Sequence, residues 1–168
     1  MEDEFDEFEF ELEEDDETEE GKFLTFTLGN EAYGLEIIYV TEIIGIQKIT
    51  EVPELPEYVI GIMSLRGQII PVMDVRLRFE KPFKEYDERT CVIVVDISDI
   101  TVGLIVDGVA EVVTIQEEDI MPHPDLSEGD NRQFVKGIGK IGKDVKLLLD
   151  IHKLLDDDEI NQQEQAFL

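Results

Sequence analysis

The chain has 168 residues, of which 42% are hydrophobic, and its 14 Lys and Arg stand against 42 Asp and Glu, which gives a formal net charge of −28 at pH 7. This length and hydrophobic fraction are enough for one globular domain with its own core. The negative charge argues against nucleic acids and anionic membranes as partners, because their phosphates would repel the chain, and leaves other proteins as the expected partners.

The first predicted segment is an acidic tail. Residues 1–20 hold fourteen acidic residues and no basic one, so half of the net charge lies there. The apolar residues Phe5, Phe8, Phe10 and Leu12 are too few to form a core against this self-repulsion, and we predict that residues 1–20 are disordered. A second interpretation stays open, in which Phe8, Phe10 and Leu12 share one face of an edge strand added to a partner.

The sequence shows no sign of secretion or of a membrane anchor. The N-terminus lacks the basic and apolar regions of a signal peptide, and no run approaches the roughly 18 apolar residues of a membrane span. Cys91 is the single cysteine, which excludes an internal disulfide framework and fits a reducing compartment. We therefore expect a soluble, cytoplasmic protein without direct membrane insertion.

From Lys22 onward, short runs rich in Val, Ile and Phe alternate with Gly, Pro and Asp, as in strands joined by turns. The predicted strands are KFLTFTL at 22–28, GQIIPVMD at 67–74, RTCVIVVDI at 89–97, TVGLIVDG at 101–108 and DVKLLLD at 144–150. Short helices are expected around DVRLRFE at 74–80 and DIHKLLDDDEINQQ at 150–163, each with an aspartate that can cap its first turn. Many short strands predict an all-β barrel or sandwich.

A faint duplication becomes visible when Gly34 is aligned with Gly103 and Gly61 with Gly137. A valine then follows six residues and a glutamate eight residues after each first glycine, and an aspartate follows thirteen residues after each second glycine: Val40 or Val109, Glu42 or Glu111, and Asp74 or Asp150. The repeat predicts two similar half-units with a shared interface. The second copy is longer by seven residues, and MPHPDLSEGDN at 121–131 is the expected place of the extra loop.

The segment GIGKIGKD at 137–144 matches the pattern G-x-G-x-x-G and nearly matches a phosphate-binding loop. A phosphate loop needs Ser or Thr after its lysine and then a helix, whereas here Asp144 follows and DVKLLLD alternates like a strand. We interpret the segment as a glycine-rich hairpin. A nucleotide-binding regulator acting through residues 137–144 is the alternative function from another class.

The remaining chemistry-bearing residues form no catalytic or metal-binding pattern. Ser64, Ser98 and Ser127 lie in no G-x-S-x-G elbow, and the two histidines, His123 and His152, are separated from each other and from the single cysteine. We predict a protein that is not an enzyme and that has no cofactor and no metal site.

Arg66 raises a separate question, because it lies between Leu65 and Gly67, where two apolar runs meet and a neutral turn residue would suffice. Its counterpart in the repeat, five residues after Gly137, is Gly142, so the turn itself does not require arginine. The simpler interpretation is a solvated surface charge. The functional one is a guanidinium held at the subdomain junction for a carboxylate of a partner, and the repeat favours it.

The segments YGLEIIYVTEII, VIGIMSLRGQIIPVMDVRLRF and VGLIVDGVAEVV, in this order and spacing, closely resemble the CheW family of bacterial chemotaxis coupling proteins. The match runs from about Lys22 to Leu155. It implies a fold of two five-stranded SH3-like β-barrels that share a core, with short helices at the edges and the C-terminus. It also divides the chain into the tail at 1–20, a CheW-like domain at 21–155 and an acidic and polar C-terminal tail at 156–168.

The resemblance implies a function as well. A CheW-like protein is a non-catalytic adaptor that joins the cytoplasmic tips of methyl-accepting chemoreceptors to the regulatory domain of the histidine kinase CheA. It would then lie in the cytoplasm, held at membrane-bound receptor arrays by protein contacts, with ring assembly with itself or with the kinase left open. The alternatives are a coupling protein for a non-flagellar chemosensory kinase pathway and a CheV-like protein, whose additional receiver domain we expect this length to exclude.

Nine residues match positions that the family ties to receptor or kinase contact: Val40, Glu42, Gly61, Arg66, Gly67, Val92, Gly103, Val109 and Val112. We predict that Arg66 and Glu42 make direct contacts. Val92 and Gly103 lie in strand patterns and are better explained as packing residues. The other three valines lie on short alternating segments that can line a groove between the barrels.

Overall fold

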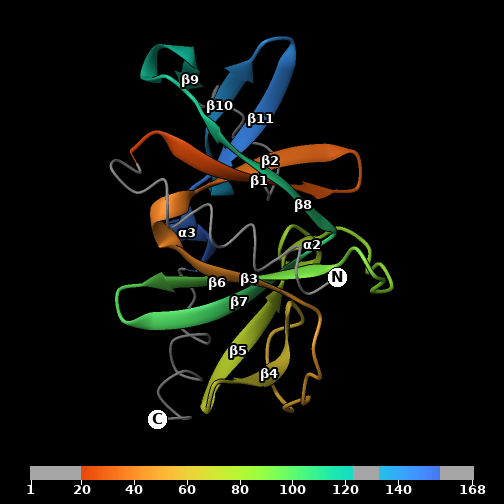
Figure 1. Ribbon diagram of the computed structural model, residues 1–168. Coiled ribbons are helices and arrows are strands. Elements are labelled where there is room, and N and C mark those ends of the chain that lie inside the picture. The colour runs from red at the N-terminus through yellow and green to blue at the C-terminus, as the bar shows by residue number, and fades with distance from the viewer. Residues whose placement is uncertain (1–19, 123–132, 156–168) are drawn as a thin grey trace.

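The computed structural model describes residues 20–122 and 133–155, which are mostly strand (Figure 1). The strands are β1 (Lys22–Leu28), β2 (Glu31–Glu36), β3 (Val40–Gly45), β4 (Val59–Leu65), β5 (Gln68–Asp74), β6 (Cys91–Ile97), β7 (Ile100–Val106), β8 (Gly108–Thr114), β9 (Ile120–Pro122), β10 (Val135–Ile141) and β11 (Asp144–Leu149). The short helices are α2 (Val75–Arg78) and α3 (Ile151–Leu154), and the 3-10 turns are η1 (Ile37–Tyr39) and η2 (Glu117–Asp119). All five predicted strands are confirmed, as β1, β5, β6, β7 and β11.

The strands form two sheets, one above the other in Figure 1. The six-stranded sheet has the order β8-β1-β2-β11-β10-β9, and the five-stranded sheet has the order β3-β6-β7-β5-β4. The all-β fold is confirmed, with one sheet of six strands and one of five; in their backbone pairing both sheets keep two edges, so neither closes into a barrel. The extra strand is β9, whose place in the five-stranded sheet is taken by a single bridge between Thr50 and Ile62.

The predicted duplication is visible in the strand order. In the five-stranded sheet β3, β6, β7, β5 and β4 occupy the places that β8, β1, β2, β11 and β10 occupy in the other sheet. Each sheet has one parallel pair at the equivalent place, β5 with β7 and β11 with β2. The pairing registers leave Thr41 of β3 and Ala110 of β8 as extra residues, so both edge strands carry a bulge at matching positions.

The two sequence halves do not coincide with the two sheets. The first half contributes β1 and β2 to the six-stranded sheet and then β3, β4 and β5 to the other. The second half contributes β6 and β7 to the five-stranded sheet and the remaining strands to the first. Each sheet is therefore completed by strands from both halves.

A shared core lies between the sheets, and each sheet has a smaller core on its other face. Alternate residues of β6 show this division: Cys91, Ile93, Val95 and Ile97 belong to the shared core, whereas Val92 and Val94 belong to the core of the five-stranded sheet. The smaller core of the six-stranded sheet consists of Phe23, Ile115 and Leu148. Burial of this apolar surface is the main force that holds the sheets together.

Both predicted helix caps are confirmed, at equivalent places in the repeat. Asp74 Oδ1 accepts the backbone N–H of Arg76 at 2.9 Å, and Asp150 Oδ1 accepts that of Lys153 at 3.2 Å. Each side chain satisfies a donor of the first turn that has no partner within the helix. Within the described residues, no helix is long and apolar enough to cross a membrane.

Asp74 makes stability depend on pH in a way that can be measured. Its side chain is buried and its Oδ2 accepts the hydroxyl of Tyr86 at 2.7 Å, and burial raises the pKa of its carboxyl group. Because the folded state holds this proton more tightly than the unfolded state, the group stabilises the fold below about pH 4, and this stability is lost as pH rises through the raised pKa. Because asparagine does not titrate, we expect the free energy of unfolding of Asp74→Asn to lack this decrease with rising pH.

The measurement is the free energy of unfolding in urea between pH 4 and pH 7, for the wild type and for Asp74→Asn. The advantage of the wild type over the variant should shrink as pH rises. Asp150→Asn, at the equivalent and more exposed cap, is the matched control. A difference between wild type and Asp74→Asn that stays constant over this range would contradict the expectation.

Candidate partner-binding site

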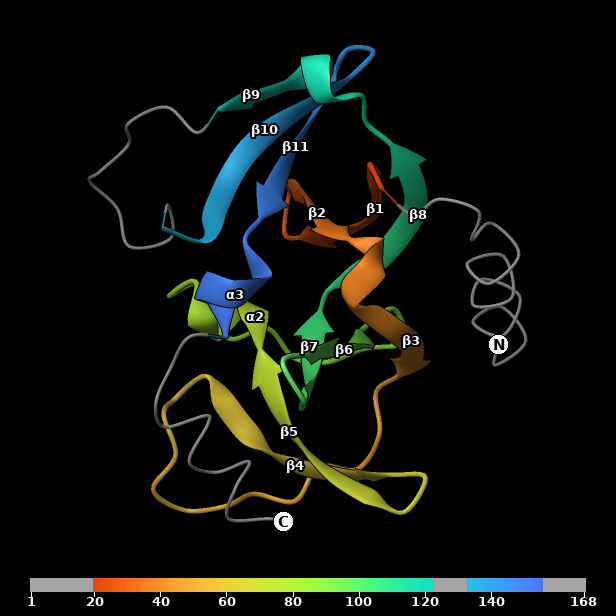
Figure 2. The ribbon, with the colours of Figure 1, turned by 90° about the vertical axis from the view of Figure 1, so that its left-hand side faces the viewer.

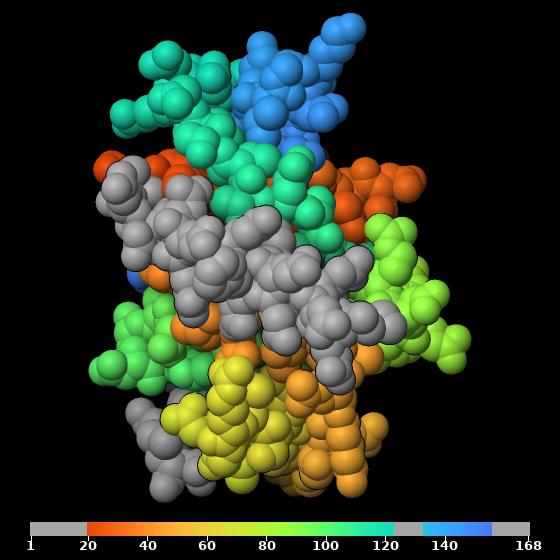
Figure 3. Space-filling model, in the orientation of Figure 1, coloured from red at the N-terminus to blue at the C-terminus, as the bar shows by residue number. Residues whose placement is uncertain are grey.

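Arg66 lies at the tip of the hairpin formed by β4 and β5. Arg66 and Gly67 form its two-residue turn, with φ angles of 52° and 82°, both in the left-handed region that type I′ hairpin turns require. In the equivalent hairpin of β10 and β11, the first turn residue is Gly142, with φ of 61°. Arg66 thus occupies a strained backbone position where the repeat has glycine, which points to a role for its side chain. The two hairpins lie at opposite ends of the molecule (Figure 3).

The Arg66 side chain pairs with Glu42. Nη1 of Arg66 donates to Oε2 of Glu42, and the exposed fractions of the two side chains are 71% and 7%. Glu42 lies on the edge strand β3 and Arg66 follows the opposite edge strand β4, so this pair joins the two edges that backbone pairing leaves apart. A buried carboxylate needs such a partner, whereas a guanidinium has further donors that can face a ligand. Of the two side chains, Arg66 is therefore the one accessible to a partner, and the buried Glu42 side chain lies beneath it.

The three valines predicted to line a groove lie on the two equivalent edge strands. Val40 is on β3, and Val109 and Val112 are on β8; all three are half-buried and pack against the shared core. In Figure 2, β3 and β8 lie on the same side of the molecule, one in each sheet. The structure thus places these valines at the sheet junction, with part of each side chain accessible.

The buried members of the predicted set are packing residues. Val92 is fully buried, and a Cβ atom at Gly103 would lie 2.9 Å from its Cγ1 atom, which confirms the interpretation of both as packing residues. A Cβ atom at Gly61 would lie 2.2 Å from the backbone oxygen of Thr50, so only glycine lets the segment around Thr50 lie against β4. Any direct contact of these three residues with a partner stays a prediction.

The glycine-rich segment at 137–144 forms the hairpin of β10 and β11, as interpreted from the sequence. Gly137 and Gly139 lie within β10, Gly142 is in the turn, and Asp144 begins β11 instead of a helix. The helix N-terminus of a phosphate loop is therefore absent from this segment. No group of three or more His, Cys, Asp or Glu side chains within residues 20–122 and 133–155 could hold a metal ion.

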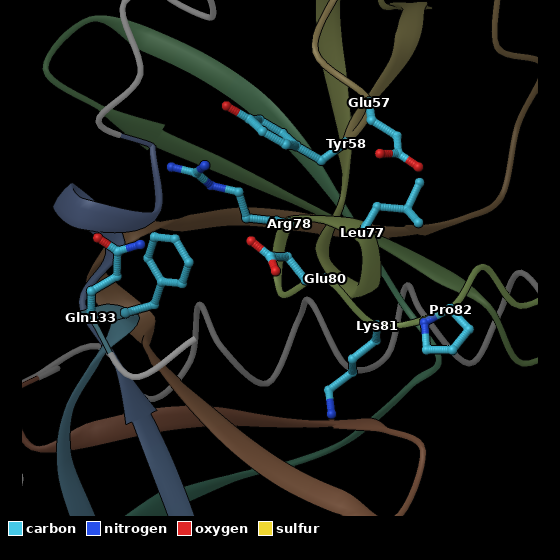
Figure 4. A pocket seen from close by; sticks show the side chains of 9 residues that line it. Glu57, Tyr58, Leu77, Arg78, Glu80, Lys81, Pro82 and Gln133 are labelled. Atoms are coloured by element: carbon cyan, nitrogen blue, oxygen red, sulfur yellow. The ribbon is translucent and has the colours of Figure 1, made fainter. Parts of the chain in front are cut away.

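One cavity had no signal in the sequence. A pocket of about 650 Å³ is lined by residues in and after α2 and by residues just before β4 and β10, among them Tyr58, Arg78 and Phe134 (Figure 4). Its members come from separate segments that show no shared pattern, so only the fold brings them together. Several sequence predictions concern residues outside the described ranges: the order of residues 1–19, His123 with the rest of its loop to residue 132, and the C-terminal tail at 156–168.

Comparison with known proteins places this geometry in a family. The family model described as CheW-like domain matches residues 22–159. "Chemotaxis protein CheW" of Klebsiella aerogenes is 39% identical over 144 residues, which cover 86% of this chain and 87% of that protein. The protein of the same name from Treponema pallidum is 32% identical over 148 residues, with 86% and 87% covered.

A solved structure agrees with the sequence relatives. It is the crystal structure of the scaffolding protein TtCheW from Thermoanaerobacter tengcongensis, with a TM-score of 0.76 and 37% identity. The match covers 83% of this chain and 94% of that one. The described sheets therefore have the arrangement found in that scaffolding protein.

Proposed function

Since the chain belongs to the CheW-like family, we propose that it is a non-catalytic chemotaxis adaptor that couples methyl-accepting chemoreceptors to the histidine kinase CheA in signalling arrays. It works in the cytoplasm and reaches the membrane only through its protein partners. Its contribution is geometric: one surface holds the receptor tip and another holds the kinase. Coupling then arises because the adaptor binds its partners with different affinity in the two signalling states of the receptor array.

The observation that carries the proposal is the pair between Arg66, at the tip of the β4–β5 hairpin, and Glu42 on β3. An exposed arginine in a left-handed turn costs backbone energy, and the buried carboxylate of Glu42 holds its guanidinium in place. A guanidinium fixed in this way loses little side-chain freedom when it binds a carboxylate of a partner. The half-buried valines of β3 and β8 supply apolar contact area at the sheet junction.

The proposal predicts that Arg66→Ala weakens binding to a receptor cytoplasmic fragment by about tenfold or more, which corresponds to about 1.4 kcal/mol. Binding is measured by calorimetry to that fragment and separately to the regulatory domain of CheA, with the thermal midpoint recorded alongside. Because Arg66→Ala leaves Glu42 without this partner, the double variant Arg66→Ala/Glu42→Gln tests whether any loss comes from an uncompensated carboxylate.

Lys143→Ala is the matched control, because Lys143 is an exposed cation in the turn of the equivalent hairpin. It should leave receptor binding unchanged. If folded wild-type protein binds neither the receptor fragment nor the kinase domain, the proposed coupling is wrong. If Arg66→Ala binds the receptor as the wild type does, Arg66 is not a contact.

A further inference from the structure

A second pocket opens on the six-stranded sheet, on the side of its smaller core. It has a volume of about 540 Å³ and is lined by residues of β1, β2, η2 and β9 to β11. Its lining includes the buried residues of that core, Phe23, Ile115 and Leu148. Charged side chains also line it: Glu20, Glu36, Glu117 and Lys136. The pocket therefore combines an apolar wall with carboxylates and one ammonium group.

The repeat shows how this place differs from its equivalent in the five-stranded sheet. When the two half-units are aligned, Glu36 takes the place of Ile105. Lys136 takes the place of Ile60 in the same alignment. Ile105 is buried in the smaller core of the five-stranded sheet, and Ile60 packs against that core. The six-stranded sheet therefore carries two charged side chains where its counterpart has packed isoleucines.

A third difference removes a bulky side chain. Gly139 takes the place of Met63, which is buried in the smaller core of the five-stranded sheet. Ile115 occupies part of the space, because a Cβ atom at Gly139 would lie 2.8 Å from its Cδ1 atom. Positions that large apolar side chains fill in one sheet are therefore glycine, glutamate and lysine in the other, at or beside the pocket.

The two charged residues at this place form an ion pair. Oε1 of Glu36 lies 2.5 Å from Nζ of Lys136, and the side chains are 31% and 38% exposed. Replacing such a pair by well-packed apolar groups is often neutral or stabilising, because the desolvation of two charges offsets much of their attraction. A polar pair in place of packed core residues is thus a departure from the rules of packing, and such departures are typical of binding sites.

The charges of the pocket favour a cation. Within the described residues Glu20 and Glu117 form no ion pair, and Lys136 offsets only one of the three carboxylates. Three carboxylates and one ammonium group leave a formal charge of −2. A lysine or arginine side chain matches both parts of the pocket. Its apolar stem can lie along Phe23 and Ile115 while its charged head reaches the carboxylates.

We propose that this pocket is the docking site of a lysine or arginine side chain that a partner protein carries next to an apolar residue. The charged head binds between Glu20 and Glu117, and a volume of about 540 Å³ has room for the neighbouring residue as well. The chain's own tail does not fit this chemistry, because residues 1–19 contain no basic residue. The site lies in the other sheet from Arg66, so its test is independent of the proposed coupling function.

The test measures binding of a short basic peptide to the full-length, isotope-labelled chain by nuclear magnetic resonance. The probe is acetyl-Leu-Arg-Leu amide, and its neutral counterpart is acetyl-Leu-Gln-Leu amide. We expect the basic peptide to shift the backbone amide signals of Phe23, Ile115 and Ile120 and to bind at least about tenfold more tightly than the neutral one at low salt. Equal binding of the two peptides, or no shift of these signals, overturns the proposal.

The carboxylates at the rim are tested by Glu20→Gln/Glu117→Gln, which removes two exposed charges and keeps the size of the side chains. This variant should bind the basic peptide about tenfold or more weakly. The matched control is Glu85→Gln/Glu88→Gln, which makes the same change of net charge at exposed positions outside the pocket and should leave the affinity unchanged. Equal affinities of the two double variants contradict the proposal.

The ion pair is tested by giving the six-stranded sheet the residues of its counterpart. Glu36→Ile/Lys136→Ile should leave the thermal midpoint unchanged or raise it, and should weaken binding of the basic peptide by about tenfold or more. A pair with a purely structural role would instead lower the midpoint when it is removed. A lower midpoint, or a variant that binds the peptide as tightly as the wild type, would mean that the pair does not serve binding and would overturn the proposal.

Discussion

Replacing Asp107 with alanine should lower the free energy of unfolding by about 3 kcal/mol or more, because it breaks an ion pair that is largely buried. Oδ2 of Asp107 lies 2.6 Å from Nη1 of Arg76, and the side chains are only 16% and 17% exposed. The same oxygen accepts the backbone N–H of Gly29 at 2.7 Å, and Nε of Arg76 donates to the backbone oxygen of Pro82 at 3.0 Å. In the variant, the Arg76 guanidinium has little access to solvent and has lost its ion pair with Asp107.

Urea unfolding at neutral pH gives the free energy of unfolding for this variant and for its control. The control is Lys84→Met, which removes an exposed ion pair with Asp87 and should change the free energy of unfolding by no more than about 0.5 kcal/mol. Equal and small losses in the two variants would show that Arg76 finds another partner or enough water when Asp107 is absent.

Gly61→Ala should cost about 2 kcal/mol of stability, within the range for inserting a methyl group where there is no room. The new Cβ atom would lie 2.2 Å from the backbone oxygen of Thr50, so the segment that pairs with β4 through Thr50 and Ile62 has to move. Gly45→Ala is the matched control, because a Cβ atom at Gly45 would meet nothing within 4 Å.

The measurement is again urea unfolding, with hydrogen exchange of the Thr50 and Ile62 amides as a local readout. The Thr50 amide donates a hydrogen bond to the carbonyl of Ile62 at 2.8 Å, and the Ile62 amide donates one to the carbonyl of Thr50 at 2.9 Å. Both amides should lose protection from hydrogen exchange in Gly61→Ala but not in Gly45→Ala. If both the protection and the free energy of unfolding are unchanged, the segment around Thr50 can move to make room for the methyl group without a loss of stability. Any weaker partner binding by this variant would then need a direct contact at Gly61.

Features set by local chemistry could be predicted from the sequence. The runs of Val and Ile identified the strands, and the aspartates before short apolar segments identified both helix caps. The duplication emerged from spacing alone and extends in the structure to matching bulges. Each of these features depends on residues that are neighbours in the chain or in a repeated pattern.

Features set by pairing between distant segments could not be predicted in the same way. Alternation identifies a strand but not its neighbour, so the division of each half between two sheets had no local signal. Glu42 shows the same limit: an acid on a strand of a strongly acidic chain looks like a solvent-facing residue, and its burial follows from where Arg66 lies in the folded sheet. The resemblance to a family named both residues, but not their contact.

The exchange of strands between the halves also shapes how the chain can fold as it is made. β2 is synthesised well before its parallel neighbour β11, so Tyr33 cannot pair with Leu147 until that later segment has been made. Closing so long a loop is slow, and it leaves one side of β2 unpaired on the nascent chain. Neither sheet can be completed before the ribosome has delivered both halves, so the two sheets should mature together as one cooperative unit.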